Sequence, residues 1–347
     1  MREDRITIAK AISIILMVAG HAGVPSEIGR FIYMFHMPLF FFVSGYCFTE
    51  KYLHDTKQFA INKVKGLYVP FVKWSLLFLL LHNVFFHLNI YNATYGFRGE
   101  ASHLYDMKET LFHATKIVVA MNGTEQLLGG YWFLKQLFVG SFISLLCFKY
   151  LRGKIAAGGG ILLVITMLMS YLNIDIPIIR LTSLGFFSAF FIVMGKVYKD
   201  NCLKMNSLWL TCLFFILVIV GSIICNTSLL AYKTWQIIPY SIFAIMGTIM
   251  VLNVSHWISN SCNAIKHLLM FIGDHTLEIL TWHFLCFKIV SLLIIEIHGL
   301  PIEQLAYFPT VRGYSHIYWP LYTIVGVSMP LLFTCCRIKI HKYVKTK

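Results

Sequence analysis

The sequence predicts an all-α membrane protein, a polytopic bundle of about ten transmembrane helices with both termini in the cytoplasm. Three observations lead to this fold class. The 347 residues are 58% hydrophobic and 16% aromatic but only 13% charged, whereas soluble domains are about a quarter charged. Apolar runs recur along the whole chain, and about 20 residues suffice to cross about 30 Å of hydrocarbon. Lysine and arginine collect in alternate loops.

Ten apolar runs are long enough to be membrane spans. Within hydrocarbon every backbone amide must be paired inside the protein, which a continuous run achieves as a helix. In chain order the runs are Ile6–Gly23, Phe31–Phe48, Leu67–Leu88, Tyr131–Phe148, Ala156–Leu172, Ile178–Val197, Leu208–Cys225, Ile237–Leu252, His275–Ile297 and Ile317–Cys336. Because no internal repeat or soluble segment separates them, we expect one integral membrane domain over residues 1–347.

Local features support several of these elements. The first run follows charged residues but has no small-residue cleavage site, which predicts a retained helix and not a signal peptide. Pro38 in the second run and Gly158–Gly160 in the fifth favour close helix packing. The segment Asn89–Gly130 between the third and fourth runs contains an amphipathic stretch, Leu111–Ala120, which we expect to lie at the membrane interface.

The loop charges orient the bundle, because cytoplasmic loops retain lysine and arginine. Nearly three-quarters of these loop residues fall on one side of the ten-span arrangement. That side carries Arg2, Arg5, Lys51, Lys57, Lys63, Lys65, Lys149, Arg152, Lys154, Lys196, Lys199, Lys204, Lys266, Arg337, Lys339, Lys342, Lys345 and Lys347. An even number of spans with both ends cytoplasmic follows. The net charge of +14 is thus explained by membrane topology, and we expect no nucleic-acid partner.

The nine cysteines indicate neither a disulfide framework nor a metal site. Their number is odd, most lie in spans, and none has CxxC or CxxH spacing. We therefore expect no structural zinc and no metal cofactor.

Ionisable residues within spans are costly, so each is a candidate for function or pairing. Lys10 and His21 are eleven residues apart on the first helix, which places them on one face, roughly 16 Å apart along the axis. Lys10 would lie toward the cytoplasm and His21 toward the outer end. The alternatives are a lysine that snorkels to the interface and a histidine that only packs.

Other spans contain further candidates. The second helix enters the membrane from the outer side, so His36 lies at a depth where it could meet His21. Lys135 follows the segment Trp132–Leu134, and His283 lies midway between Glu278 and Lys288 in the ninth run. Structural pairing inside the bundle is the alternative for this group.

Three segments of the N-terminal part resemble the membrane-bound acyltransferase-3 family, whose members acylate cell-surface polysaccharides and related glycans. They are RITIAKAISIILMVAGHA, FHMPLFFFVSGYCF and INKVKGLYVPF. Lys10 and His21 match the family's basic residue, ten intervening residues and histidine, and lysine at this place resembles the fucose 4-O-acetylase-like branch. Thr7 departs from the pattern, because many relatives carry aspartate there.

Further positions are similar to family landmarks, but the resemblance is weaker beyond about residue 75. Lys63, Lys65 and Pro70 fall on the basic-then-proline element, and Trp132–Leu134 and the His283-Phe284 pair are similar to later motifs.

The resemblance implies an O-acyltransferase of the bacterial cytoplasmic (inner) membrane. The expected donor is cytoplasmic acyl-CoA, with acetyl as the family's commonest acyl group and succinyl as the alternative, and the expected acceptor is a glycan hydroxyl, on a lipid carrier or a nascent polymer. A histidine suits the role of base because its pKa is near neutrality. The expected site comprises the catalytic residues His21, Lys10 and His36; Lys10, Lys63, Lys65 and Lys73 for the coenzyme A phosphates; and Arg30, Trp132, Lys135 and His283 as substrate or support residues.

Three other classes are alternatives: a transporter, a polysaccharide polymerase and a membrane scaffold without chemistry, the last of which does not explain so many ionisable residues in spans. A transporter or flippase of lipid-linked sugars often contains inverted repeats with broken helices, and none is evident here. A polysaccharide polymerase would be expected to use a larger outer loop rich in arginine and histidine than Asn89–Gly130 provides.

Overall fold

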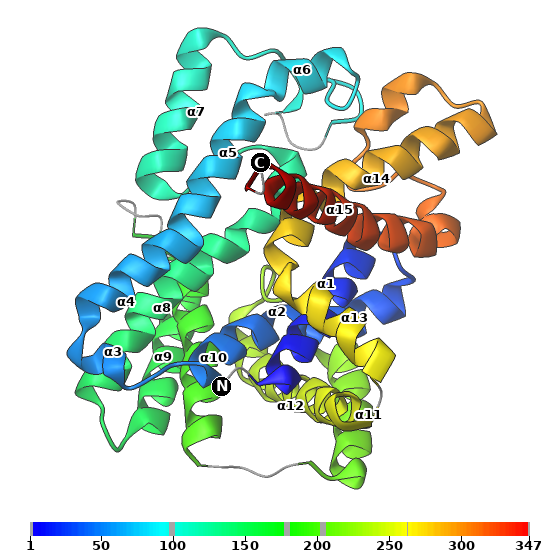
Figure 1. Cartoon of the computed structure of the whole chain (residues 1–347). Helices are drawn as coiled ribbons and strands as arrows, with labels where there is room; N and C mark the ends of the chain where they lie inside the picture. The colour runs from blue at the N-terminus through cyan, green and yellow to red at the C-terminus, as the bar shows by residue number, and fades with distance from the viewer. Residues whose placement is uncertain (1–2, 97–100, 177–180, 202–205, 262, 346–347) are drawn as a thin grey trace. The chain divides into compact units, whose positions relative to one another are not determined.

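A computed structural model of the chain describes residues 3–96, 101–176, 181–201, 206–261 and 263–345 (Figure 1). It is 80% helical, and no β-strand occurs in the described ranges. The longer helices are α1 (Asp4–His21), α2 (Ser26–Tyr46), α5 (Val69–Leu80), α7 (Met107–Ala120), α8 (Trp132–Tyr150), α9 (Ile155–Tyr171), α10 (Ser183–Asp200), α11 (Leu208–Cys225), α12 (Ile237–Ser261), α13 (Asn263–Asp274), α14 (Thr276–His298) and α15 (Ser315–Lys345). The shorter ones are α3 (Lys51–His54), α4 (Thr56–Lys63), η1 (Val64–Tyr68), α6 (His82–His87), η3 (Gln126–Tyr131), η4 (Thr234–Gln236) and η5 (Ile302–Ala306).

Among the described residues, six helical segments are long and apolar enough to cross a membrane. They are Ser26–Tyr46, Gln126–Tyr150, Leu208–Cys225, Thr234–Asn260, Thr276–His298 and Ser315–Lys339. Each coincides with an expected span, so the prediction of a multi-pass helical membrane protein is confirmed. The number ten and the cytoplasmic placement of both termini stay predictions.

The other four expected spans are helical but shorter or more charged. α9 has 17 residues, and α1 and α10 each carry three charged residues. The expected start of the sixth span at Ile178 lies outside the described residues.

The third expected span, Leu67–Leu88, is interrupted and is not one continuous helix, and its crossing of the membrane stays a prediction. A π-turn, η1, precedes α5, and the helix is interrupted at Leu81 before α6 begins. Pro70 explains the first irregularity, because its ring removes an amide donor from the helical hydrogen-bond pattern.

The chain forms two compact units that interleave along the sequence. The first unit contains Met1–Ser13, Ser26–Phe71 and Phe133–Met270; the second contains Ile14–Pro25, Val72–Trp132 and Phe271–Lys347. The expectation of a single domain stays a prediction.

The first unit is built around the contact between α2 and α10. A Cβ added to Gly45 would overlap the carbonyl oxygen of Ile192, and one added to Gly195 would overlap that of Phe42. The two backbones therefore touch through reciprocal glycines, the small-residue packing by which membrane helices approach closely. α10 also packs on α9, and α12 packs on both α2 and α11.

The second unit is organised by α14, which packs against α15, η3 and η5. Lys288 on α14 donates to the carbonyl oxygens of Leu305 and Tyr307, each at 2.7 Å. These bonds satisfy a buried ammonium group and hold the segment after α14 on that helix. For Lys288, these contacts match the alternative given by the sequence, in which the residue is paired for structural reasons inside the bundle.

Within the second unit, a buried ion pair attaches the Asn89–Gly130 segment to α6. His82 Nδ1 lies 3.1 Å from Glu125 Oε1, and both side chains are 2% exposed. His82 Nε2 lies 3.0 Å from the carbonyl oxygen of His103. Because both ring nitrogens face oxygen acceptors, the arrangement favours an imidazolium paired with a carboxylate. Tyr105 stacks on the His82 ring, with 3.5 Å between the centroids.

The amphipathic stretch expected at Leu111–Ala120 belongs to α7. This helix starts earlier, at Met107, because the Asp106 side chain accepts a hydrogen bond from Glu109 N at 2.7 Å and caps it. Leu111 and Val119 are exposed while Ile117 is buried. An exposed apolar face supports the interfacial position, which stays a prediction.

Candidate active site

His21 occupies the last turn of α1, the same helix that carries Lys10. The chain turns directly afterwards at Gly23, whose φ is +87°, and a Cβ there would lie 2.5 Å from Ser315 Cβ. Only glycine combines this left-handed conformation with the close approach. The turn therefore holds the end of α1 against the start of α15 and places His21 inside the second unit.

The His21 ring lies against His283 of α14. Their ring centroids are 5.6 Å apart with an interplanar angle of 28°, and Phe284 lies 4.9 Å from His21. His21 is half-buried, whereas His283 is fully buried. The second unit thus pairs two imidazoles contributed by the two ends of the chain.

Hydrogen bonding defines the tautomer of neutral His283. Its Nδ1 lies 3.0 Å from the carbonyl oxygens of Ile279 and Leu280, so Nδ1 carries the proton and donates to the helix backbone. Nε2 then holds a lone pair, and among the described residues it has no hydrogen-bond partner. Buried polar atoms are normally paired, so an unpaired one suggests a group kept for a ligand.

Two glycines of η3 pack beside the histidine pair. A Cβ on Gly130 would lie 2.9 Å from Leu280 Cδ1 and 3.9 Å from His283 Cε1, and one on Gly129 would lie 3.5 Å from the Phe284 ring. Tyr131, the next residue, shares a 2.6 Å hydrogen bond with Thr281. These contacts fix η3 on α14 directly before Trp132, where α8 begins.

The first unit holds most of the remaining expected site residues. Lys10 and Lys63 lie close enough to Cys47 for their charges to act on its thiol, and Lys63 Nζ donates to Ser44 Oγ at 3.4 Å. His36 is buried, with Nδ1 2.8 Å from the Ile32 carbonyl oxygen. The others are Lys65, exposed in η1, Lys135, half-buried in α8, and Arg30, 3.4 Å from Glu27 Oε1.

The structure therefore brings His283 to His21 and groups Lys10 with Lys63. His36 and Lys135 belong to the first unit, and their cooperation with His21 stays a prediction. Lys73 lies in the second unit, exposed, with its ammonium 4.8 Å from the Trp74 ring centroid. Over the described ranges, no group of three or more His, Cys, Asp or Glu residues is placed to hold a metal ion.

Sequence reasoning assigned His283 a supporting role and did not pair it with His21. The signals that were present are its place in the middle of an apolar run and the following phenylalanine, which packs on both imidazoles. Neither signal identifies His21 as the residue that His283 contacts.

Long apolar helices define the class, a multi-pass membrane protein, and its second unit holds a half-buried histidine against a fully buried one. A model of the acyltransferase-3 family, described as an acyltransferase domain, matches residues 3–336. The chain belongs to this family and is an acyltransferase. The match gives no support to the transporter alternative. Neither the curated proteins nor the solved structures gave a match to the chain.

Proposed function

We propose that the protein transfers an acetyl group from cytoplasmic acetyl-CoA to a hydroxyl of a cell-surface glycan, with His21 as general base. The observation that carries this proposal is the contact between His21 and His283 at the end of the helix that also bears Lys10. Membership in an acyltransferase family supports the reaction class. The motif in the first helix supports the fucose 4-O-acetylase-like branch.

The chemistry requires a base and a fixed thioester. His21 accepts the proton of the glycan hydroxyl while its oxygen attacks the thioester carbonyl, and a tetrahedral intermediate forms. The intermediate collapses, the carbon–sulfur bond breaks, and the coenzyme A thiolate takes the proton back from His21. The described residues offer no hydrogen-bond partner to His21, so its ring nitrogens are available to substrate.

His283 acts in this scheme as a positioning residue. Its stacked ring limits the orientations of His21. Its Nε2 lone pair provides a hydrogen-bond acceptor for a second hydroxyl of the glycan, because the attacking hydroxyl gives its only proton to His21. His36 and Lys135 remain the residues proposed to assist.

The donor would enter from the cytoplasmic side, where Lys10 and Lys63 share the surroundings of Cys47. Lys65 and Lys73 complete the proposed phosphate-binding set. The roughly 16 Å between Lys10 and His21 along one helix corresponds to the reach of an extended pantetheine arm. The acceptor would arrive from outside on a lipid carrier or nascent polymer, at the bacterial inner membrane.

The test is mass spectrometry of the surface glycan from cells with and without the gene. We expect a mass difference of one acetyl group per modified repeat. His21→Ala should abolish it at an unchanged amount of protein in the membrane. His298→Ala is the matched control, because His298 is an exposed histidine at the far end of α14. Acetylated glycan from His21→Ala cells would overturn the assignment.

A further inference from the structure

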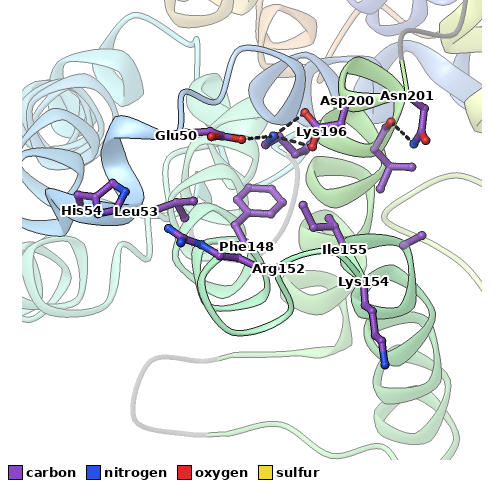
Figure 2. A pocket seen from close by; sticks show the side chains of 13 residues that line it. Glu50, Leu53, His54, Phe148, Arg152, Lys154, Ile155, Lys196, Asp200 and Asn201 are labelled. Atoms are coloured by element: carbon purple, nitrogen blue, oxygen red, sulfur yellow. Dashed lines mark hydrogen bonds and ion pairs between the residues drawn. The ribbon is translucent and has the colours of Figure 1, made fainter.

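A polar pocket in the first unit is lined by charged residues that have no role in the proposed function. Its cavity of about 540 Å³ is bordered by Glu50 and α3, by the turn between α8 and α9, and by the C-terminal part of α10 (Figure 2). Sites for small ligands and cofactors typically measure about 300–1,000 Å³. The pocket is thus large enough for a nucleotide.

Both carboxylates in the pocket, Glu50 and Asp200, lie beside one buried lysine. Lys196, which is 4% exposed, has its Nζ 2.5 Å from Asp200 Oδ1 and 3.6 Å from Glu50 Oε1. Figure 2 shows this group on one side of the pocket. A single buried ammonium therefore contacts two acidic side chains, of which Asp200 is 37% and Glu50 80% exposed, and the three groups together carry one net negative charge.

Two further cations in the pocket have no such compensation. Arg152 and Lys154 flank Gly153 in the turn between α8 and α9, and both are exposed. Neither side chain forms a hydrogen bond or ion pair with the described residues. In Figure 2 the Lys154 side chain runs away from the Lys196 group. With Lys196, these cations outnumber the two carboxylates of the pocket by one. A net positive charge at a hollow favours phosphate, and the guanidinium of Arg152 suits two phosphate oxygens at once.

The pocket also offers surface for a base. Leu53 and Ile155 provide apolar contact, and the exposed imidazole of His54 provides a ring for stacking. Phosphate-binding cations beside such surface match a purine nucleotide better than inorganic phosphate alone.

The pocket lies next to the segment that accompanies Lys10. Cys47, beside Lys10 and Lys63, is three residues before Glu50. Lys199 on α10 donates to the Phe48 carbonyl oxygen at 3.2 Å, which fixes α10 to this segment. The same loops lie on the side that the charge pattern assigns to the cytoplasm.

We propose that Arg152 and Lys154, with Lys196 behind them, bind the 3′-phosphorylated adenosine end of the acyl-CoA donor. The proposal rests on the proposed function, because it assumes an acyl-CoA donor. It goes beyond the proposed function by assigning the adenosine and its 3′-phosphate to the turn between α8 and α9, which leaves the pyrophosphate to the lysines proposed above. Lys10 and Lys63 then serve the pyrophosphate and pantetheine portion.

The test compares acetyl-CoA with 3′-dephospho-acetyl-CoA as donors for the full-length protein in lipid nanodiscs. In Arg152→Gln/Lys154→Gln we expect the KM for acetyl-CoA to rise at least about tenfold at an unchanged kcat. The KM for the dephospho donor should change little, so that the variant no longer distinguishes the two. Lys149→Gln is the matched control, since Lys149 is a nearby cation that faces the Tyr150 ring and does not line the pocket.

A KM that is unchanged, or that rises equally for both donors, would overturn the proposal. A phospholipid headgroup is the other source of the same phosphate chemistry. If the double variant differs from wild type only in its dependence on anionic phospholipid, the pocket binds lipid and the proposal is wrong.

A binding measurement separates this proposal from the proposed function. Titration calorimetry with adenosine 3′,5′-bisphosphate should show binding to the wild type and to Lys149→Gln, but not to the double variant. If this pattern holds while no acetyl group reaches a glycan, the proposed acceptor is wrong and the nucleotide pocket stands. If the wild type transfers acetyl groups from acetyl-CoA but does not bind the bisphosphate, the pocket assignment fails alone.

Discussion

Removing the carboxylate of Glu125 should strongly destabilise the second unit. The perturbation is Glu125→Leu, which leaves His82 buried without its ionic partner. At 3.1 Å and an effective dielectric constant of about 20, two unit charges attract by about 5 kcal/mol before the cost of desolvation. Measured losses on breaking buried pairs are about 3–5 kcal/mol, and we expect a value in this range because both side chains are 2% exposed.

The assay is thermal unfolding of purified protein in detergent, followed by tryptophan fluorescence. A loss of this size corresponds to a melting temperature lower by roughly 10 °C. Limited proteolysis should cut between residues 89 and 130 faster in the variant, because the pair attaches this segment to α6.

A double substitution tests the reasoning behind that magnitude. Replacing both partners, as in His82→Phe/Glu125→Leu, removes the unpaired charge and keeps an aromatic ring against Tyr105. The double variant should therefore recover most of the stability lost by Glu125→Leu. A single variant that loses less than about 1 kcal/mol, or a double variant that is less stable than the single one, would refute the ionic interpretation.

Three further predictions concern packing, pH and the site. Gly45→Ala should unfold or misassemble the first unit, because its Cβ overlaps the Ile192 carbonyl oxygen; Gly66→Ala, with open space around its Cβ, is the control, and equal melting temperatures would contradict the packing. Burial lowers the pKa of Lys63 to about 8, so this lysine is charged below that pH and loses its charge above it. The KM for acetyl-CoA should rise above about pH 8, and Lys63→Arg should keep it flat; identical profiles would exclude Lys63 from donor binding. His283→Phe should keep the ring beside His21 but lower kcat by roughly 10-fold or more, and full activity would show that the Nε2 lone pair has no role.

The fold class was predictable because hydropathy is a property of consecutive residues. An apolar run of about 20 residues has few stable conformations in hydrocarbon other than a helix. Lys10 and His21 could be placed on one helix for the same reason, since helical periodicity relates positions a fixed number of residues apart. Charge distribution among the loops added an expected orientation.

Several local features could not be predicted from hydropathy and helical periodicity. The third apolar run looks continuous, yet it is divided into η1, α5 and α6. Pro70 indicates that the helical hydrogen-bond pattern is disturbed, but it does not predict that the disturbance is a π-turn. The His82–Glu125 pair joins α6 to a residue near the end of the Asn89–Gly130 segment, 43 residues later. No pattern around either residue identifies the other as its partner.

The sequence by itself determined that this protein is a helical membrane acyltransferase with a lysine and a histidine on its first helix. Only the tertiary structure placed His283 against His21, and Arg152 and Lys154 at a pocket with Lys196. The physical reason is that periodicity and composition act over neighbouring residues. Contacts between distant segments depend instead on how whole helices pack, through glycines such as Gly45 and Gly23 whose partners lie far away in the chain.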